Sequence, residues 1–236
     1  MPAVAAEKRS YVRMPRDQRM REIEAAARSA FAKHGFNDAP ISEIARRAGV
    51  SEGAIYKFYA NKRELLHAIL TGWYGGITEA FHAKQRGVEG TRARLHAVIW
   101  QHLKSIQESP DLCRLFYSEV RSAPDYQSSE LHRCNRDYTR VLTDILEAGI
   151  ERGDIRADVS LPLVRDMVFG GIEHRVTGFL AGRGALDPDA VADEMTRMLF
   201  AGIAPPVEEA TDLGAIVSRL ESVAERLDTA GLGAQE

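Results

Sequence analysis

The chain has 236 residues, of which 44% are hydrophobic and 28% charged, a composition typical of a globular protein with a sizeable core. No apolar run approaches the ~20 residues that span a bilayer, and the first residues lack the apolar segment of a secretory signal. We therefore expect a cytoplasmic protein without membrane contact. Two cysteines, Cys113 and Cys134, are too few for a disulfide framework or a cysteine-built metal site.

The net charge of −3 conceals an asymmetry along the chain. Residues 1–64 carry 13 Lys/Arg and 8 Asp/Glu, whereas the remainder carries 18 and 26. A basic end on an acidic body fits a polyanion-binding end whose body is repelled by the same polyanion. A solvated basic arm without a partner fits the charges equally well.

Nearly every segment has the apolar spacing of a helix, and none has a convincing strand alternation, so we predict an all-α fold of about nine to ten helices. The first predicted helix ends at Gly35, and a short second helix ends at Gly49. Ser51 is a natural N-cap for a third helix at 52–59. That helix must be short, because "NKRE" resembles a capping box that starts the next helix at Asn61.

The remaining predicted helices are longer, and their ends are marked by Gly, Pro, Ser and Asp residues. They cover 62–84, 91–108, 110–120, a strongly amphipathic segment through 138–150, 160–180, 187–203 and 212–228. The sequence "GWYGG" interrupts the first of them, and we expect it to bend or flex there. A kink fixed by packing is the alternative.

The stretch "SEGAIYKFYANK", residues 51–62, is the main candidate for function. With the short helix before it and the turn "AGVSEG", it forms a helix-turn-helix pattern. Its first residues are small, which permits close approach to an external surface, and Tyr56 and Lys57 suit contacts with phosphates and bases. Ile55 and Tyr59 lie four residues apart and share the inward face. The alternative is a hairpin whose aromatic residues all belong to the core.

Two charged residues of this stretch sit near helix starts. Glu52 could accept a hydrogen bond from a cytosine amino group, or simply favour the positive end of its helix. Lys62 stands at the start of the next helix, where free backbone amides and a cation together would bind a phosphate.

Residues 30–66, "AFAKHGFNDAPISEIARRAGVSEGAIYKFYANKRELL", resemble the N-terminal DNA-binding domain of TetR-family transcriptional regulators. The shared pattern is a Gly-aromatic turn, Ile-Ala-x-x-Ala-Gly-Val-Ser, Gly-x-hydrophobic-Tyr-x-aromatic-aromatic, and then Lys and Glu-Leu. The later helical layout, including "GIERGDIRADVS" at 149–160, resembles the effector-binding domain of the same family.

The resemblance implies four segments. They are a basic arm at 1–15, a three-helix helix-turn-helix domain at 16–63, a helical effector-binding and dimerisation domain at 64–203, and a linker with an extra helix at 204–236. It also implies a homodimer that binds a palindromic double-stranded DNA operator, most simply as a repressor, and that a small ligand releases. No cofactor or metal is implied.

The resemblance also places the expected DNA contacts. They are Ser42, Ser51, Glu52, Gly53, Ala54, Tyr56, Lys57, Phe58 and Lys62. Two departures stand out. The family often has Thr or Ser at the start of the second helix, where this chain has Ala39 and Pro40, so Ser42 is the substitute. Phe58 lacks the hydroxyl that the family often has at this position for a phosphate contact.

The body of the chain offers candidate ligand and dimer residues. Aromatic side chains that would line a pocket for a mostly apolar ligand are Trp100, Phe116, Tyr117 and Phe169. Each could equally be an ordinary core residue. An acyl-CoA is one ligand that the resemblance suggests. The expected dimer face lies on the helices 160–180 and 187–203, with Gly170, Gly171, Met195, Met198 and Leu199; packing within one monomer is the alternative.

The sequence gives little support for an enzyme. Its seven histidines form no metal signature such as H-E-x-x-H, and there is no Gly-x-Ser-x-Gly or phosphate loop. Three hypotheses remain: a ligand-responsive DNA-binding repressor, a DNA-binding architectural or adaptor protein without an effector, and an all-helical enzyme that retains a helix-turn-helix.

Overall fold

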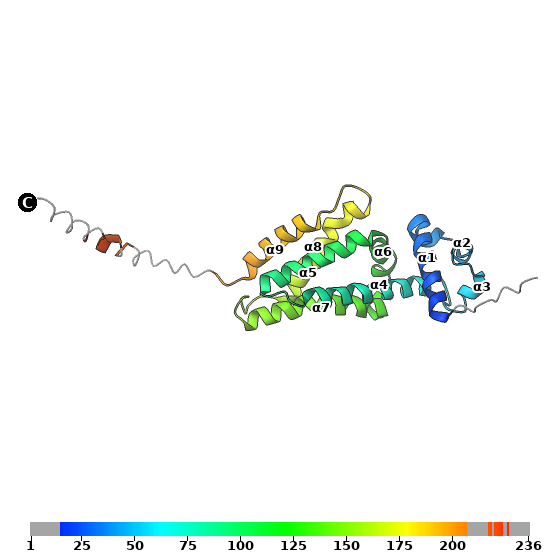
Figure 1. Ribbon diagram of the computed structural model, residues 1–236, viewed down its shortest axis with the longest axis horizontal. Coiled ribbons are helices and arrows are strands. Elements are labelled where there is room, and N and C mark those ends of the chain that lie inside the picture. Colours follow the sequence, from blue (N-terminus) through cyan, green and yellow to red (C-terminus); the bar gives the residue numbers. More distant parts are fainter. Residues whose placement is uncertain (1–14, 207–216, 219, 224–225, 227–236) are drawn as a thin grey trace, which may run out of the picture.

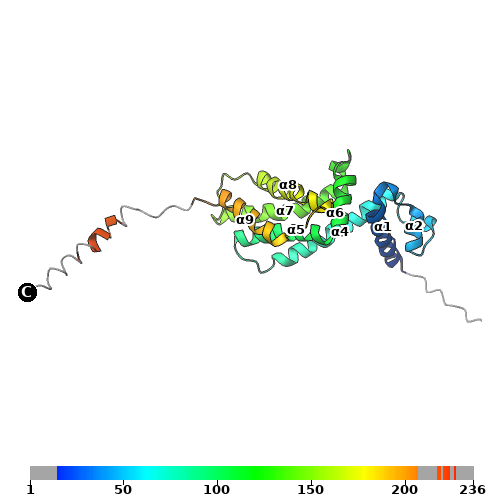
Figure 2. The same cartoon turned by 90° about the horizontal axis from the view of Figure 1, so that it is seen from above.

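A computed structural model of the protein describes residues 15–206, 217–218, 220–223 and 226. A small group of helices, α1 to α3, lies at one end of a larger group, α5 to α9, and α4 runs from one group into the other in both views (Figures 1 and 2). The helices are α1 (Arg16–Asp38), α2 (Ile41–Arg47), α3 (Glu52–Ile55), α4 (Lys62–Gln85), α5 (Thr91–Glu108), α6 (Pro110–Leu115), α7 (Glu130–Glu151), α8 (Leu161–Leu180) and α9 (Pro188–Ile203), with a π-helix at Phe116–Arg121 and a 3₁₀ turn at Tyr126–Ser128.

The all-α prediction is confirmed for the described residues, which contain no strand. Most helix ends fall where cap residues predicted them. Ser51 Oγ accepts a hydrogen bond from the Ala54 amide, and Asn61 Oδ1 accepts one from the Glu64 amide. Asp187 caps α9 in the same way, immediately before a proline in the first turn. Gly35 has φ 76° and breaks the helical path inside α1, a conformation that glycine adopts without steric cost.

Three predicted elements differ in detail. The helix expected at 52–59 is α-helical only over Glu52–Ile55 and continues as a hydrogen-bonded turn that closes with Tyr59 N to Ile55 O at 3.0 Å. Helix α4 passes through "GWYGG" without a break, because three glycines lower helix propensity but remove no backbone hydrogen bond. The segment 110–120 changes from α-helix to π-helix at Phe116.

The predicted C-terminal helix at 212–228 lies mostly outside the described residues. Residues 217–218, 220–223 and 226 are helical, and the side chains of Val217, Leu220 and Val223 are exposed.

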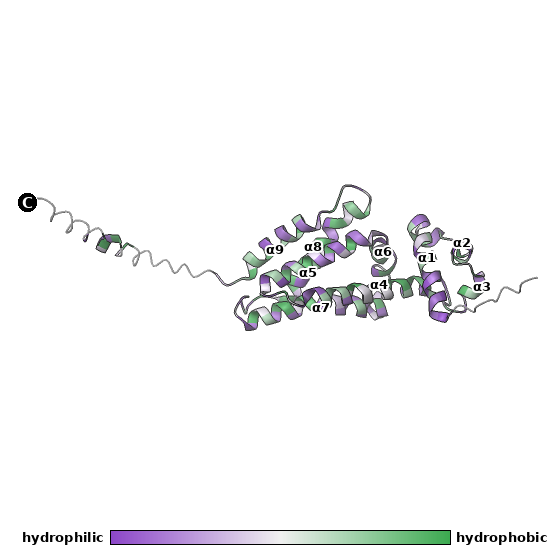
Figure 3. Cartoon of the chain, in the orientation of Figure 1, coloured by the Kyte–Doolittle hydropathy of each residue, from purple (hydrophilic) through white to green (hydrophobic). Residues whose placement is uncertain are grey.

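The core follows the amphipathic faces of the helices. Hydrophobic and hydrophilic residues alternate along most helices in Figure 3, as expected when each helix turns one side to its neighbours. In the small group, α1 packs against α2 and α4, and α2 packs against α3, whereas the larger group packs α5 between α7 and α9. The buried side chains of both groups form one continuous cluster, so the position of the small group depends on the larger one.

Gly149 and Gly75 give contrasting tests of this packing. A Cβ at Gly149 would lie 2.7 Å from Ile155 Cδ1 and 2.8 Å from Thr91 Cγ2, both buried, whereas a Cβ at Gly75 would meet nothing within 4 Å. We expect Gly149→Ala to lower the free energy of unfolding by about 1–3 kcal/mol because of overpacking. Gly75→Ala should raise it by about 0.5–1 kcal/mol, because alanine favours the helix. Urea titration measures both, and equal effects would contradict the packing described at Gly149.

Candidate nucleic-acid interface and effector cavity

Helix α3 and the turn after it divide into two faces. Ile55 and Tyr59 are buried, as the sequence predicted, whereas Tyr56 is 49% exposed and Lys57 is exposed beside it. Among the other expected DNA contacts, Ser51, Glu52 and Gly53 are exposed and Ala54 is half-buried. Lys57 makes no ion pair or hydrogen bond with any described residue, so its charge is available to an external partner.

The inward face is fixed to α1 by a polar contact as well as by burial. The Tyr59 hydroxyl donates a 2.7 Å hydrogen bond to Glu24 Oε1. Burial, and then the hydrogen bond and charge of Glu24, raise the pKa of Tyr59, so the hydroxyl keeps its proton and remains a donor at neutral pH. This contact holds the last turn of the helix-turn-helix in a single orientation relative to α1.

Lys62 has a structural role that the sequence did not predict. Its ammonium group donates to Asn37 O at 2.8 Å and to Ala39 O at 3.2 Å, and it lies 5.2 Å from the centre of the Phe36 ring. These contacts tie the end of α1 to the start of α4. A phosphate contact by Lys62 stays a prediction, and it would have to share the ammonium group with these carbonyl oxygens.

Phe58 and Ser42 are the remaining expected contacts. Phe58 is half-buried against the core, and the guanidinium of Arg16 lies 5.8 Å from the centre of its ring. Ser42 is exposed in the first turn of α2. The structure thus gives Ser42 access to a partner, while Phe58 contributes mainly to packing.

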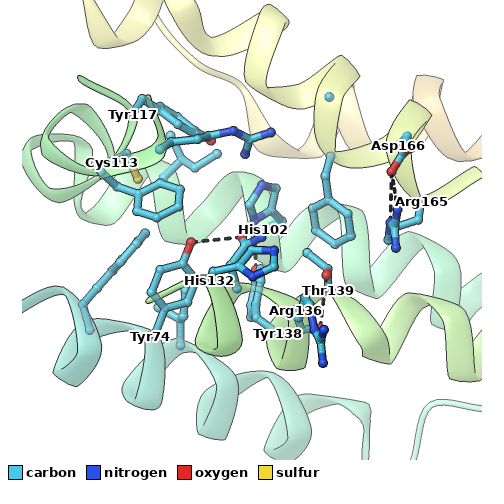
Figure 4. Close-up of a pocket in the computed structure, with 18 residues that line it drawn as sticks. Tyr74, His102, Cys113, Tyr117, His132, Arg136, Tyr138, Thr139, Arg165 and Asp166 are labelled. Carbon is cyan, nitrogen blue, oxygen red and sulfur yellow. Dashed lines mark hydrogen bonds and ion pairs between the residues drawn. The ribbon is translucent and has the colours of Figure 1, made fainter. Parts of the chain in front are cut away.

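The larger helical group encloses a cavity of about 360 Å³ (Figure 4). Its walls come from α4, α5, α6, the π-helix, α7 and α8. Three of the four expected ligand residues, Phe116, Tyr117 and Phe169, line it. The π-helix supplies two of these aromatic side chains, and such local departures from α-helix occur often at functional sites.

Trp100 is the exception, because it does not line this cavity. Its indole nitrogen donates a 2.7 Å hydrogen bond to Asp189 Oδ1, and Lys84 Nζ lies 4.4 Å from the centre of its ring. The side chain therefore links α5 to α9 and the end of α4. Helical spacing could not separate this face of α5 from the one that faces the cavity.

Sequence reasoning missed the polar residues of the cavity. His102 Nδ1 lies 3.0 Å from the Tyr138 hydroxyl, and the Tyr74 hydroxyl donates to Asn135 Oδ1 at 3.1 Å. All four residues line the cavity. Burial lowers the pKa of His102 to about 4, so its ring is neutral at pH 7. The spacing of His102 on α5 carried no motif that could have identified it.

Three arginines also line the cavity. Arg121 pairs with Glu173 at 3.1 Å and Arg165 with Asp166 at 2.8 Å, whereas exposed Arg136 makes no ion pair with any described residue. Figure 4 shows Arg136 and the Arg165–Asp166 pair on the same side of the cavity. The cavity therefore combines aromatic walls with cations, a combination suited to an apolar ligand that carries an anionic group.

Two ion pairs tie α1 and the start of α4 to the segment 110–128. Arg28 of α1 donates to both carboxylate oxygens of Asp111, at 2.7 and 2.9 Å, and Asp111 is in the first turn of α6. Arg63 of α4 pairs with Asp125 at 2.9 Å. Although partial burial acts against it, the bond from Arg28 lowers the pKa of Asp111. Since α6 and the π-helix line the cavity, the Arg28–Asp111 pair joins its wall directly to the helix-turn-helix.

Helices α8 and α9 expose an apolar groove of about 550 Å³. Leu163 and Met198 are 58% and 63% exposed there, and Met167, Met195 and Leu199 also line it. Of the two glycines expected at the dimer face, Gly171 is exposed and a Cβ there would lie 3.7 Å from Met195 Cε, whereas Gly170 lines the 360 Å³ cavity. Leu163 and Met167 are thus apolar groove residues that the sequence did not single out.

Other chemistry has little basis in the described part of the chain. No group of three His, Cys, Asp or Glu residues there could hold a metal ion, and none of the helices described is long and apolar enough to cross a membrane. Cys113 and Cys134 are free thiols. Burial raises the pKa of Cys113 to about 12, which keeps it out of the reactive thiolate form.

A helix-turn-helix joined to a larger helical body with an internal cavity is the architecture of a DNA-binding regulator that has room for a ligand. Residues 23–69 match the family described as "Bacterial regulatory proteins, tetR family", and residues 89–203 match "Tetracyclin repressor-like, C-terminal domain". The chain therefore belongs to the TetR family of transcriptional regulators.

Relatives with known names agree with this assignment. The chain is 26% identical over 192 residues to the fatty acid metabolism regulator protein of Bacillus subtilis, covering 81% of this chain and 98% of the relative. It is 23% identical to the transcriptional repressor KstR2 of Rhodococcus jostii, over 80% of this chain and 92% of that one. The solved structure of the regulator FadR from Bacillus subtilis in complex with stearoyl-CoA has a TM-score of 0.70, 26% identity and coverage of 78% of this chain and 98% of that one.

Lys57 offers a direct test of the exposed face of α3. We expect Lys57→Ala to weaken operator binding and to reduce the slope of log affinity against log salt by about one, because one phosphate contact is lost. Lys84→Ala, at the end of α4 far along the chain from α3, is the control and should leave the slope unchanged. Fluorescence anisotropy over a salt series measures both, and an unchanged slope for Lys57→Ala would exclude its phosphate contact.

Proposed function

We propose that this TetR-family regulator is a cytoplasmic repressor that binds a palindromic operator as a homodimer and is released by an acyl-CoA-like effector. The observation that carries the effector assignment is the cavity, whose lining includes three aromatic side chains and three arginines, of which Arg136 makes no ion pair with any described residue. The aromatic side chains are Phe116, Tyr117 and Phe169, and the arginines are Arg121, Arg136 and Arg165. An acyl-CoA has the matching chemistry, because an apolar chain is joined to anionic phosphates. The similarity to a regulator solved with stearoyl-CoA supports the same class.

The exposed groove on α8 and α9 supports the dimer. Its side chains, such as Leu163 and Met198, are large and apolar, and single monomers rarely leave such residues together in water. In a symmetric dimer, the groove of each subunit would cover that of the other. The two helix-turn-helix domains of such a dimer would lie at a fixed spacing and bind two half-sites related by symmetry. We therefore propose a palindromic operator.

The two alternative functions lack such supporting features. An enzyme would need a reactive nucleophile, a metal site or a base that works near neutral pH. Burial raises the pKa of Cys113 to about 12 and lowers the pKa of His102 to about 4, which leaves no thiolate and only a weak base in the cavity. An adaptor that binds no effector would not account for the cavity between the helices. We therefore retain a non-enzymatic, ligand-responsive regulator as the proposal.

The path from the cavity to DNA follows from the contacts of α6. Its Cys113 and the adjoining Phe116 line the cavity, while Asp111 at its start holds Arg28 of α1. A ligand that displaces these cavity-lining side chains would shift α6 and with it the carboxylate that positions the helix-turn-helix. The three glycines of "GWYGG" in α4 would ease such a movement, and that role stays a prediction.

The central test uses the purified protein and random DNA. Selection of bound sequences should yield a palindrome, and sedimentation should give a dimer. Titration with hexadecanoyl-CoA should then lower affinity for that operator by about five- to 150-fold, the usual range of allosteric coupling. Coenzyme A without an acyl chain is the control. A non-palindromic site would contradict DNA binding by a symmetric dimer. An operator affinity that acyl-CoAs do not lower would contradict the proposed effector class.

Variants of the Arg28–Asp111 pair test the proposed connection from the cavity through α6 to the helix-turn-helix. We expect Arg28→Gln and Asp111→Asn each to reduce the effector-induced fold-change in operator affinity by about three- to tenfold. The reason is that α1 is then no longer held to α6 by this ion pair. The double exchange Arg28→Asp with Asp111→Arg should restore part of the fold-change. Arg140→Gln, which removes a surface pair with Asp144 on α7, serves as the control. An effector response that is the same in all variants would rule out this pair as the link.

A further inference from the structure

His102 is a polar residue of the cavity wall that the proposed function does not use. It projects from α5, in the interior of the larger helical group, and lines the cavity together with aromatic side chains. The residue as a whole is half-buried, and its imidazole lies among the side chains that line the cavity.

The orientation of this ring is fixed by two neighbouring helices. The Tyr138 hydroxyl of α7 is 3.0 Å from Nδ1, and the Phe169 ring of α8 meets the imidazole edge to face at 5.0 Å between centres. Since Nδ1 is occupied by Tyr138, Nε2 is the other hydrogen-bonding atom of the ring. It has no partner among the described residues. A side chain held this firmly presents one polar atom to a ligand at little cost in entropy.

The charge state of the ring restricts what it can recognise. Burial keeps the imidazole neutral at pH 7, as its lowered pKa shows. When the Tyr138 hydroxyl donates to Nδ1, the neutral ring carries its proton on Nε2 and can donate a hydrogen bond to a carbonyl or hydroxyl oxygen. An anionic group would be better bound by the guanidinium of Arg136, which makes no ion pair with any described residue. The Tyr74 hydroxyl, another polar group of the cavity, is already bonded to Asn135. The anionic and neutral parts of a ligand would thus be recognised at different places.

We propose that His102, positioned by Tyr138, selects effectors whose buried part carries a neutral oxygen, either the carbonyl of an acyl thioester or a hydroxyl or ketone on the chain. This inference rests on the proposed effector class and adds a specificity-determining residue to it. A fully saturated hydrocarbon at the same place would leave Nε2 without a partner in an apolar surrounding, and such an unpaired polar atom is costly. An ordered water that satisfies Nε2 in every complex is the alternative, and it would remove the selectivity.

The test compares ligands that differ by one oxygen. Direct binding is measured by calorimetry for hexadecanoyl-CoA, for its thioether analogue without the carbonyl, and for a hydroxylated and a keto form of hexadecanoyl-CoA. We expect at least one oxygen-bearing partner to bind about three- to tenfold tighter than the matched ligand without that oxygen, the effect of one buried hydrogen bond. The thioester pair and the chain-oxygen pairs distinguish the two sources of the oxygen.

Variants then assign the preference to His102. His102→Leu should bring the ratio of affinities close to one, Tyr138→Phe should reduce it, and His102→Gln should keep part of it. His174→Leu, an exposed histidine on α8, is the matched control. Thermal unfolding and operator affinity without ligand verify that each variant is folded. Equal affinities for every matched pair in the unmodified protein, or a preference that survives His102→Leu, would overturn the proposal.

The outcomes also separate this inference from the proposed function. If acyl-CoAs release DNA but show no dependence on the oxygen, the function stands and the role of His102 is wrong. If the oxygen preference is present but no ligand releases DNA, His102 recognises a ligand and the effector role is wrong. If none of these ligands binds, both proposals fail.

Discussion

A single uninterrupted helix, α4, belongs to both helical groups, and the arrangement of the whole protein depends on its packing. Its 24 residues extend over about 36 Å. Leu65 and Leu66 in its first turns are buried beside α1, whereas Tyr74 and Phe81 are buried farther along, beside α7. Because side chains on one rigid helix cannot move independently, a displacement of the cavity wall formed by α4 must be passed to the small group, or be absorbed by the exposed glycines between them.

The DNA-reading element is small, and its precision comes from its anchors. Helix α3 has only four α-helical residues, too few to be stable in isolation. Its orientation is set by the burial of Ile55 and Tyr59 and by the hydrogen bond from Tyr59 to Glu24. The outward face can therefore consist of small and exposed residues, which permit a close approach to a groove. Lys62 contributes indirectly, because it ties the end of α1 to the start of α4.

Different residues of the cavity suit different parts of a ligand. The aromatic walls of the cavity suit an apolar chain, its arginines suit an anion, and His102 is a neutral polar group held by Tyr138. The same walls reach α6, whose first turn holds Arg28 through Asp111. In the proposed mechanism, one short helix and the π-helix that follows it therefore connect the ligand with the helix-turn-helix. A ligand would then act on DNA binding only when it displaces this segment.

The sequence by itself determined the helices, most of their ends and the two faces of α3. Caps such as Ser51 and Asn61, the glycine at 35 and the spacing of Ile55 and Tyr59 act within a few residues, so local patterns are sufficient to predict them. Only the tertiary structure decided the role of Lys62, the exclusion of Trp100 from the cavity and the inclusion of His102. The ammonium of Lys62 meets carbonyls more than twenty residues away, and His102 meets Tyr138 and Phe169 from two other helices. Periodicity shows that a side chain lies on a given face of its helix, but the neighbours of that face are set by how distant helices pack.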